Sequence, residues 1–519
     1  MLDLKILNGT VLDGTGGPAV LADIGIEGDR IAVVGSLAAA ESRRTLDARD
    51  RSVCPGFIDA HSHSDVYLLV EPTAPSKIFQ GVTTEVVGNC GTSAAPMTGH
   101  YRMPSDWSAV PLPGTWKTVA EFRRLVEHAR PAVNVVMLIG HNTLRGGVIG
   151  YNNTPASESD LAAMTRLLEQ ALDEGGRGFT TGLIYRPGMF ASRAELTALA
   201  KVAGRRGGIY TSHIRSEGGH LLEALDEALA IGRAAGARVQ IAHLKTSKAP
   251  NWNKLDAALG LIRAARNEGL VVGADRYPYT ASWTSLDVIL PRWAQEGGND
   301  AELARLRDPS TRRRVREDLL RSLRDEDWQS IIIGSVGRPD YASYQGRRLA
   351  DVAAELSLEP VDTALRIIES DELRTSAFYA WMNEENMIRI LAEPYVMIGS
   401  DASIRALTGP LSLDFAHPRA YGTFPRFLRM AVDGKTVPLA EAVRKMTSLP
   451  AEQFGLGDRG VIARGRKADL VIFDPKTVRD ASTYASPHQF GPGIEEVIVN
   501  GVLTLRGGAF TGDRAGRIL

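Results

Sequence analysis

The stretch Val53-Cys-Pro-Gly-Phe-Ile-Asp-Ala-His61-Ser-His63-Ser-Asp65 decides the fold, because a short apolar run ends there in two histidines spaced one residue apart. On an extended strand, this spacing directs both imidazoles to the same face. A pair of imidazoles at the end of a buried strand suits a borderline metal such as zinc. The stretch therefore predicts a metal-dependent hydrolase.

Four further ligand-type residues close apolar runs in the same way: Cys90, His213, His243 and Asp401. We expect each of them at the carboxyl end of a strand. Parallel-barrel enzymes place their chemistry at that end, because side chains and loops converge there on one cavity. The pattern predicts one centre with the metal ligands His61, His63, Cys90, His213, His243 and Asp401.

The chain between residues 53 and 457 alternates short apolar strands with amphipathic helices, which is typical of parallel β/α units. Strands are expected at 53–59 and near residues 83, 134, 178, 208, 238, 270 and 395. Eight strands predict an α/β fold, a (β/α)8 TIM-type barrel. The stretch from about 287 to 346 is rich in Arg, Asp and Glu and breaks this rhythm, so we expect an insertion near the barrel mouth.

The two ends of the chain share a different sequence pattern. Residues 1–52 alternate short apolar strands with Asn-Gly and Gly-Asp-Arg turns, and residues 458–519 return to the same pattern. The segments Ile6-Leu-Asn-Gly and Ile498-Val-Asn-Gly even echo one another. We expect both ends to complete one small β-sandwich domain beside the barrel.

Composition limits the class of protein. With 519 residues, 44% of them hydrophobic, the chain can bury a large core. Its net charge of −1 argues against a nucleic-acid partner, and no apolar run approaches the roughly 18 residues of a membrane span. Only two cysteines are present, so no disulfide framework is expected. We expect a cytoplasmic protein that takes a small-molecule substrate, and leave homo-oligomerisation open.

The ligand set also indicates a reaction. Hydrolysis of an amide near neutral pH needs a deprotonated water, a stabiliser for the developing oxyanion and a proton for the leaving amine. A divalent metal supplies the first two. Asp401, placed beside such a metal, is suited to accept the proton of the water and pass it to the departing nitrogen. We therefore predict Asp401 as the general base and acid.

Several stretches resemble the amidohydrolase superfamily and, within it, the N-acyl-D-amino-acid deacylase (D-aminoacylase) family. They are PGFIDAHSHSD, GVTTEVVGNCG, GLIYRPG, YTSHIRSEG, IAHLKTS, YPYTAS, MIGSDAS, HPRAYGTFPR and MTSLPAEQFGLGDRGVIARGRKADLVIFDP. The paired histidines alone indicate the superfamily, whereas Cys90 and the HPRAYGTFPR stretch narrow it to the deacylases. The resemblance implies zinc-dependent hydrolysis of N-acyl-D-amino acids to a carboxylate and a free D-amino acid.

The resemblance also implies how the ligands divide. One zinc is expected in a tight site made by Cys90, His213 and His243. A second, weaker divalent site is expected from His61, His63 and Asp401, with Cys90 as a candidate bridge. Many superfamily members use a carboxylated lysine on the fourth strand, and the corresponding stretch 178–183 has no lysine.

Substrate-binding residues are implied in the same way. Arg419 matches the carboxylate-binding arginine of the family, and its guanidinium has the fork geometry that a carboxylate needs. Lys245, Tyr185 and Tyr277 match positions that line family active sites. Arg292 is a candidate partner for an acidic side chain and equally an ordinary solvated charge.

Three other functions stay open. The first is another amidohydrolase, acting on a cyclic amide as dihydroorotases and hydantoinases do, or on an isoaspartyl dipeptide. Those enzymes usually carry the lysine that is absent here. The second is a non-catalytic barrel-fold binding protein, which would be expected to have lost ligands. The third is a serine hydrolase, but the sequence lacks the Gly-x-Ser-x-Gly element.

Overall fold

Eight parallel strand segments form the centre of the computed structural model, which describes residues 1–37 and 39–519. They are β6 (Phe57–Asp59), β7 (Val82–Val87), β8 (Asn134–Met137) continued after Leu138 by β9 (Ile139–Gly140), β10 (Gly178–Gly182), β11 (Ile209–His213), β12 (Arg238–Ile241), β13 (Val272–Arg276) and β17 (Val396–Ile398). Neighbouring strands pair in the orders β6-β7-β8 and β9-β10-β11-β12-β13-β17.

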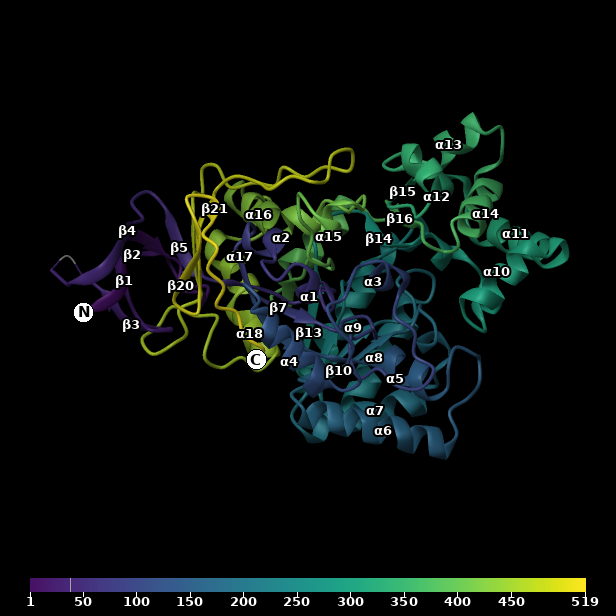
Figure 1. The fold of residues 1–519 in the computed structure, drawn as a ribbon, viewed down its shortest axis with the longest axis horizontal. Coiled ribbons are helices and arrows are strands. Elements are labelled where there is room, and N and C mark those ends of the chain that lie inside the picture. Colours follow the sequence, from purple (N-terminus) through teal and green to yellow (C-terminus); the bar gives the residue numbers. More distant parts are fainter. Residues whose placement is uncertain (38) are drawn as a thin grey trace.

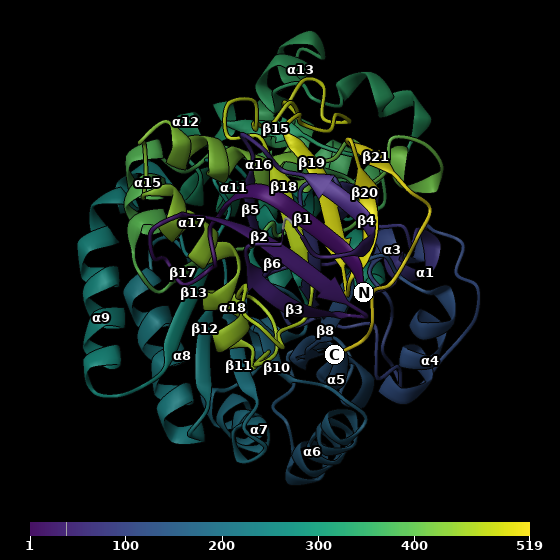
Figure 2. The same cartoon turned by 90° about the vertical axis from the view of Figure 1, so that its left-hand side faces the viewer.

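The first and last strands of this series also meet. The Ala60 N–H donates to the Ile398 carbonyl at 3.2 Å, and the Asp401 N–H donates to the His61 carbonyl at 2.8 Å. The α/β fold of parallel strands predicted from the sequence is confirmed, and its strand ends share one rim. Figure 2 shows α7, α8 and α9 on the outside of β11, β12 and β13.

The longer helices that connect the strands are α4 (Val119–Ala129), α5 (His141–Val148), α6 (Glu158–Asp173), α7 (Arg193–Arg205), α8 (Leu221–Ala235), α9 (Leu255–Asn267), α15 (Glu384–Ala392), α16 (Arg419–Val432), α17 (Leu439–Met446) and α18 (Ser448–Gln453). Local sequence sets their ends. Ser157 and Asp160 form a capping box at the start of α6. Gly236 ends α8 with a φ of +61°, which glycine adopts without steric cost. Short helices α1 (Tyr67–Val70), α2 (Pro75–Ile78) and α3 (Ser105–Ser108) lie in loops.

Both ends of the chain build a single nine-stranded sheet beside the barrel, on the left of Figure 1. Its strands are β1 (Leu2–Val11), β2 (Val20–Glu27), β3 (Arg30–Gly35), β4 (Ser42–Asp47), β5 (Ser52–Pro55), β18 (Leu470–Phe473), β19 (Ile494–Val499), β20 (Val502–Arg506) and β21 (Ala509–Phe510). Apolar side chains from both ends share one core, in which Ile6 and Ile24 pack with Leu470 and Ile498. The opposite side chains of β18 and β19, such as Val471 and Val497, join the barrel core.

The run 53–59 does not form the single first barrel strand expected from its sequence. The chain changes sheets at Gly56: β5 pairs with β1 and β18, while β6 pairs with β7. Gly56 permits this crossing because a Cβ there would lie 2.1 Å from the Thr83 hydroxyl. The predicted domain boundary between 52 and 53 consequently falls inside β5.

A second core lies at the barrel mouth, on the right of Figure 1. Its helices are α10 (Asn299–Arg307), α11 (Pro309–Ser322), α12 (Asp325–Gln329), α13 (Leu349–Glu355) and α14 (Pro360–Ser370), and its strands are β14 (Ser282–Ser285), β15 (Ile331–Ile333) and β16 (Ser376–Tyr379). Its buried side chains run from Leu286 to Tyr379, well beyond the predicted end at 346. The sequence pattern missed this end because α13 and α14 have the amphipathic texture of ordinary barrel helices.

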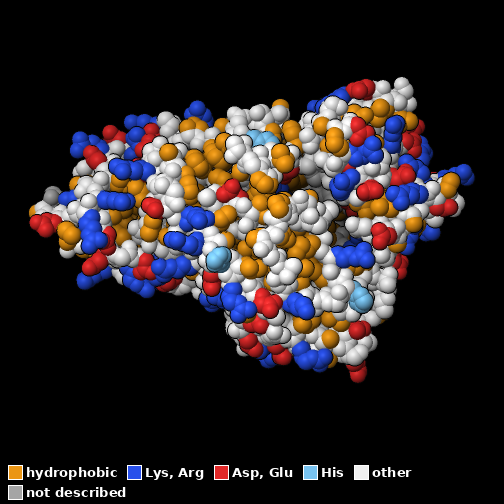
Figure 3. Space-filling model, viewed as in Figure 1, with side chains coloured by type: hydrophobic (Ala, Val, Ile, Leu, Met, Phe, Trp, Pro, Cys, Tyr) orange, Lys and Arg blue, Asp and Glu red, His pale blue; other side chains and the backbone are white. Residues whose placement is uncertain are grey.

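Charges of both signs are interspersed over the face shown in Figure 3, in keeping with the net charge of −1. Among the described residues, no helix combines the length and the apolar character needed to cross a membrane.

Candidate metal centre

The structure places all six predicted ligands at one rim of the barrel. His61 and His63 follow β6, Cys90 follows β7, His213 ends β11, His243 follows β12, and Asp401 follows β17. Parallel strands bring their carboxyl ends to the same side. Residues up to 340 positions apart in the sequence therefore become neighbours.

Cys90 lies at the centre of the cluster. Its Sγ atom is 3.3 Å from His61 Nε2 and 3.4 Å from His243 Nε2. One donor atom from each of His61, Cys90, His243 and Asp401 lies within 4.8 Å of the others. The ring of His213 packs edge-on against that of His243, with centroids 4.3 Å apart. The structure thus brings together the residues that the sequence predicted as ligands.

Asp401 connects the paired histidines to Arg419. Its Oδ1 atom is 3.4 Å from His61 Nε2 and 3.1 Å from His63 Nε2, while its Oδ2 atom is 2.9 Å from Arg419 Nη1. The Asp401 side chain is 11% exposed, and that of His63 is 26% exposed. The cluster is therefore buried except on the His63 side, where solvent reaches it.

Three of the ligand residues have an unusual backbone. The φ angles of Cys90, His243 and Asp401 are +51°, +35° and +51°. Residues with a Cβ rarely adopt this left-handed region, and such strain concentrates at functional sites, where the surrounding structure holds it. Each of these residues lies where a strand turns into its loop, so the strained turn directs the side chain into the cluster.

Asp275 orients two of the ligands, although the sequence did not single it out. Its Oδ1 atom lies 3.0 Å from His61 Nδ1 and accepts the His243 N–H at 2.8 Å. Gln240 Nε2 donates to the other oxygen at 2.9 Å. A carboxylate on the far nitrogen of a ligand histidine fixes its tautomer and its orientation. The only signal in the sequence was a carboxylate near the end of an apolar strand.

Glu217 plays the corresponding part for His243 and was also missed. Its Oε1 atom lies 2.8 Å from His243 Nδ1, and it pairs with Lys245 Nζ. Lys245 Nζ is itself 2.7 Å from His243 Nδ1. Predicted as a substrate residue, Lys245 therefore contacts the metal cluster through Glu217 and His243. The position of Glu217, four residues after His213, was the available signal.

Burial and charge compete at the acidic groups. Burial alone would raise the pKa of the Cys90 thiol, but His61 and His243 hold it well below its ordinary value. Burial likewise opposes ionisation of Asp401, but Arg419, followed by His243 and His61, keeps its pKa well below the usual range. The surrounding cations thus favour the anionic form of both groups, the form in which thiolates and carboxylates bind metals.

The residues of the cluster fit a zinc ion. Thiolate and imidazole are the donors that zinc prefers, and three to four of them suffice. Both ring nitrogens of His213 are buried and, among the described residues, have no hydrogen-bond partner. Buried polar atoms are rarely left unpaired. A metal ligand role for His213 would account for one of these two nitrogens.

Arg419 and Tyr277 form a second group beside Asp401. The Arg419 guanidinium lies 4.5 Å from the centroid of the Tyr277 ring. Arg419 is 2% exposed, and its Nε atom and the Tyr277 hydroxyl are buried without a partner among the described residues. Lys245 Nζ lies 6.0 Å from the same ring. These groups provide unpaired donors next to the metal cluster.

Tyr185 and Arg292 occupy different surroundings. The ring of Tyr185 packs edge-on against His213, with centroids 5.0 Å apart, and its hydroxyl accepts from Thr284 Oγ1 at 3.2 Å. Arg292 is exposed, and its guanidinium lies 5.2 Å from the ring of Phe190. Tyr185 therefore lies at the cluster, whereas the contacts of Arg292 point to no specific partner.

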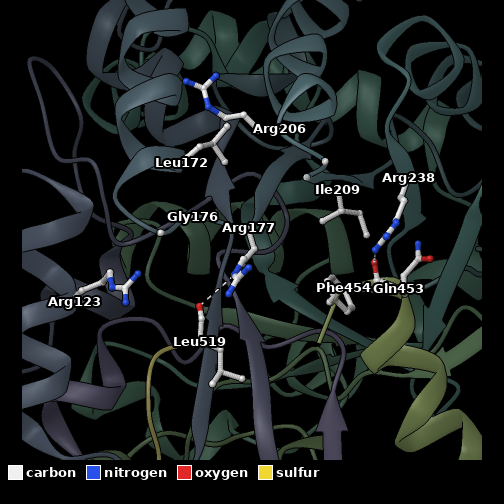
Figure 4. A pocket seen from close by; sticks show the side chains of 14 residues that line it. Arg123, Leu172, Gly176, Arg177, Arg206, Ile209, Arg238, Gln453, Phe454 and Leu519 are labelled. Carbon is white, nitrogen blue, oxygen red and sulfur yellow. Dashed lines mark hydrogen bonds between the residues drawn. The ribbon is translucent and has the colours of Figure 1, made fainter. Parts of the chain in front are cut away.

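A hollow of about 540 Å³ opens elsewhere on the barrel and is shown in Figure 4. Its walls include Arg177, Ile209 and Arg238, which lie at the amino ends of β10, β11 and β12. Arg177 Nε donates to the Leu519 carbonyl at 3.3 Å across it. The hollow lies at the end of the strands opposite the ligand cluster, so we assign the chemistry to the cluster.

Comparisons with known proteins show which proteins this chain resembles. The model of the amidohydrolase family matches residues 44–505. The chain is 38% identical over 508 residues to N-acyl-D-glutamate deacylase of Alcaligenes xylosoxydans xylosoxydans, covering 96% of this chain and 93% of the relative.

Solved structures show the same similarity. The N-acyl-D-glutamate deacylase of Bordetella bronchiseptica, complexed with zinc and a phosphonate that mimics the tetrahedral intermediate, superimposes with a TM-score of 0.86. It is 35% identical, and the match covers 100% of this chain and 99% of that one. A D-aminoacylase also superimposes, with a TM-score of 0.85 at 36% identity, and the match covers 100% of both chains. That protein has a binuclear metal centre, with activation by one metal and attenuation by the second.

Proposed function

Because the chain belongs to the amidohydrolase family, within its N-acyl-D-amino-acid deacylase (D-aminoacylase) branch, we propose that it hydrolyses the amide bond of N-acyl-D-amino acids, using zinc. The products are a carboxylate and a free D-amino acid. The observation that carries the proposal is the cluster of thiolate, imidazole and carboxylate donors from Cys90, the histidines and Asp401, with the Arg419 guanidinium against the second oxygen of Asp401.

Cys90, His213 and His243 would hold the tightly bound zinc. His61, His63 and Asp401 would line a weaker divalent position, and Cys90, close to both His61 and His243, is suited to connect the two. When bound, zinc lowers the pKa of a coordinated water toward about 7 and polarises the scissile carbonyl. The imidazole and carboxylate donors of the weaker position also suit cobalt or manganese.

Asp401 moves the proton in this scheme. Its low pKa leaves it ionised at neutral pH, so its carboxylate can accept the proton of the attacking water. The same group then donates that proton to the leaving nitrogen, which departs as the free amine. A single residue serves both proton transfers because the attacking oxygen and the leaving nitrogen are bound to the same carbon.

Arg419 and Tyr277 are suited to hold the substrate. The free carboxylate of an N-acyl amino acid needs a cation, and Arg419 carries a buried Nε donor with no partner in the described part of the chain. The Tyr277 hydroxyl supplies a further donor. Lys245 adds positive charge beside Tyr277, and Tyr185 borders His213 from the other side. We propose these four as the substrate-binding residues.

The predicted cytoplasmic location stays a prediction. Both cysteines are free and buried, which agrees with a reducing compartment.

The direct test is an assay of the zinc-loaded enzyme against N-acetyl-D- and N-acetyl-L-amino acids, with detection of free amine. We expect release from D-substrates only. An Asp401→Asn variant should lose activity by between about 10²- and 10⁴-fold, the usual contribution of acid–base catalysis. The absence of release from every substrate, despite bound metal, would overturn the proposal and favour cyclic amides or dipeptides.

A further inference from the structure

Lys77, on α2, is a cation that is wholly buried against the loops carrying the paired histidines and Asp401. Its Nζ atom lies within hydrogen-bond distance of four acceptors, Asp59 Oδ2 at 2.7 Å, the Ala402 carbonyl at 2.9 Å, Ser400 Oγ at 3.1 Å and Ser62 Oγ at 3.2 Å, which share its three N–H donors. Nζ also lies 3.6 Å from Glu85 Oε2. One ammonium group therefore links α2 to the ends of β6, β7 and β17.

On the histidine side, Lys77 acts through Ser62, which lies between His61 and His63. The Ser62 hydroxyl donates to Glu85 Oε2 at 2.6 Å, and Lys77 approaches the same hydroxyl. Asp59 Oδ1 accepts the backbone N–H of His61 at 3.2 Å. Charged groups therefore fix the backbone that carries both imidazoles: Asp59 binds the His61 N–H, and Glu85 and Lys77 contact the Ser62 hydroxyl.

On the carboxylate side, Lys77 contacts both neighbours of Asp401. It donates to Ser400 Oγ and to the Ala402 carbonyl. Asp59 Oδ1 accepts the Ser400 N–H at 2.8 Å, and its Oδ2 accepts the Ser400 hydroxyl at 2.5 Å. The φ of Asp401 is +51°, a strained value that needs such support from both sides.

The network is also sensitive to the loss of its cation. Asp59 and Glu85 are both wholly buried, and Glu85 Oε1 has no partner among the described residues. Burial raises the pKa of Glu85, while Lys77 opposes that rise. Removing Lys77 would leave two buried carboxyl groups without their shared cation, which strongly disfavours the present arrangement. The loops on either side would then move apart or rearrange.

We propose that Lys77 is a positioning residue that sets the geometry of the His61, His63 and Asp401 half of the metal centre without touching the metal or the substrate. The proposal rests on the proposed function, because it assigns these three residues to the weaker metal position. It follows that Lys77 controls the affinity of that position, while the half made by Cys90, His213 and His243 is independent of it.

Lys445, on α17, offers a matched control. It is a second lysine that is wholly buried, and its Nζ donates to the carbonyls of Glu393 and Val396 at the start of β17. Lys77 and Lys445 therefore secure opposite ends of the same strand segment. Only Lys77 contacts the residues next to the ligands, so a Lys445→Met variant reproduces the loss of a buried lysine away from the metal centre.

The test compares metal binding by the full-length wild-type, Lys77→Met and Lys445→Met proteins, by competition with a chelator. Cobalt added one equivalent at a time separates the two halves, because the tighter site fills first. The cobalt–thiolate absorption band of that first equivalent then reports the metal held by Cys90, His213 and His243. Ser400→Ala, a smaller change that removes one Lys77 contact together with the hydroxyl bond from Ser400 to Asp59, provides a second variant should Lys77→Met fail to fold. Thermal unfolding of the metal-free proteins measures the structural cost of each change.

We expect Lys77→Met to keep the cobalt–thiolate band and to weaken the second metal equivalent by about 10- to 100-fold, the usual effect of losing an outer-shell partner. Ser400→Ala should weaken it in the same direction by a smaller factor. Lys445→Met should lower the unfolding temperature and leave both affinities unchanged. Equal second-site affinities in all four proteins would overturn the proposal. If the wild type binds two metals but cleaves none of the acylated amino acids, the proposed function fails while this comparison stands.

Discussion

Arg419 Nη1 lies 2.9 Å from Asp401 Oδ2, so the predicted acid–base residue and the predicted carboxylate-binding residue form a buried ion pair. The other oxygen of Asp401 faces His63 and His61. Asp401 thereby connects the substrate side of the site to the metal side. A change at Arg419 should consequently be felt both in substrate binding and in proton transfer.

The pH profile tests this ion pair. Arg419 is the strongest of the cations that lower the pKa of Asp401, so Arg419→Met should raise that pKa. Because catalysis needs the ionised carboxylate, the acidic limb of the kcat/KM profile should move to higher pH, and KM should rise as well. Arg426→Met, on the same helix but paired with Asp480, should leave the acidic limb in place. An unshifted limb in the Arg419 variant would contradict the coupling.

The two cysteines give a matched pair for metal binding. Cys90→Ser removes the central thiolate and should weaken the tight zinc by more than the roughly 10- to 100-fold typical of an outer-shell change. Cys54 is wholly buried in β5, and burial raises the pKa of its thiol, so Cys54→Ser should keep the zinc affinity. Zinc per protein after dialysis against a chelator measures both. Equal retention by the two variants would remove Cys90 from the metal centre.

Asp275 should matter through the histidines that it orients. Asp275→Asn keeps the shape of the side chain but removes the negative charge that faces His61 Nδ1 and the His243 N–H. Metal affinity should therefore fall by about 10- to 100-fold. Asp371→Asn is the control: this buried carboxylate binds Thr375 and Gly337 in the inserted core. Isothermal titration with zinc distinguishes them. Equal affinities in both variants would argue that Asp275 has no part in metal binding.

Lys445 predicts a pH dependence of stability. Burial lowers its pKa to about 8, from an ordinary value of 10.5. Between these two values the unfolded chain binds more protons than the folded one, so the free energy of unfolding gains a contribution as pH rises from 8 to 10.5. Below pH 8 that contribution is absent. Urea unfolding measures the free energy of unfolding of the wild type and of Lys445→Met at several pH values. Over this window the difference between the two free energies should move in favour of the wild type. A difference that stays constant with pH would contradict the lowered pKa.

Much of the fold could be predicted from the sequence because local sequence patterns determine where its strands and helices lie. The segments near residues 83, 178 and 238 are strands, as their apolar runs predicted. Apolar alternation and helix caps act over short distances along the chain. The prediction of one continuous strand over 53–59 was wrong, because the chain changes sheets at Gly56. The predicted end of the insertion at 346 came too early, because the inserted core continues to Tyr379. Local sequence pattern decides neither feature.

The sequence by itself determined the kinds of ligand, since a thiol, four imidazoles and a carboxylate each close an apolar run, and the class of fold, since strands and helices alternate. Only the tertiary structure decided which atoms face each other: Cys90 between His61 and His243, Asp275 and Glu217 behind the histidines, and Lys77 against the loops of β6 and β17. The physical reason is that these contacts join residues from 15 to more than 320 positions apart. Spacing along the chain sets the face of a strand, whereas distance across a barrel is set by how the strands pack together.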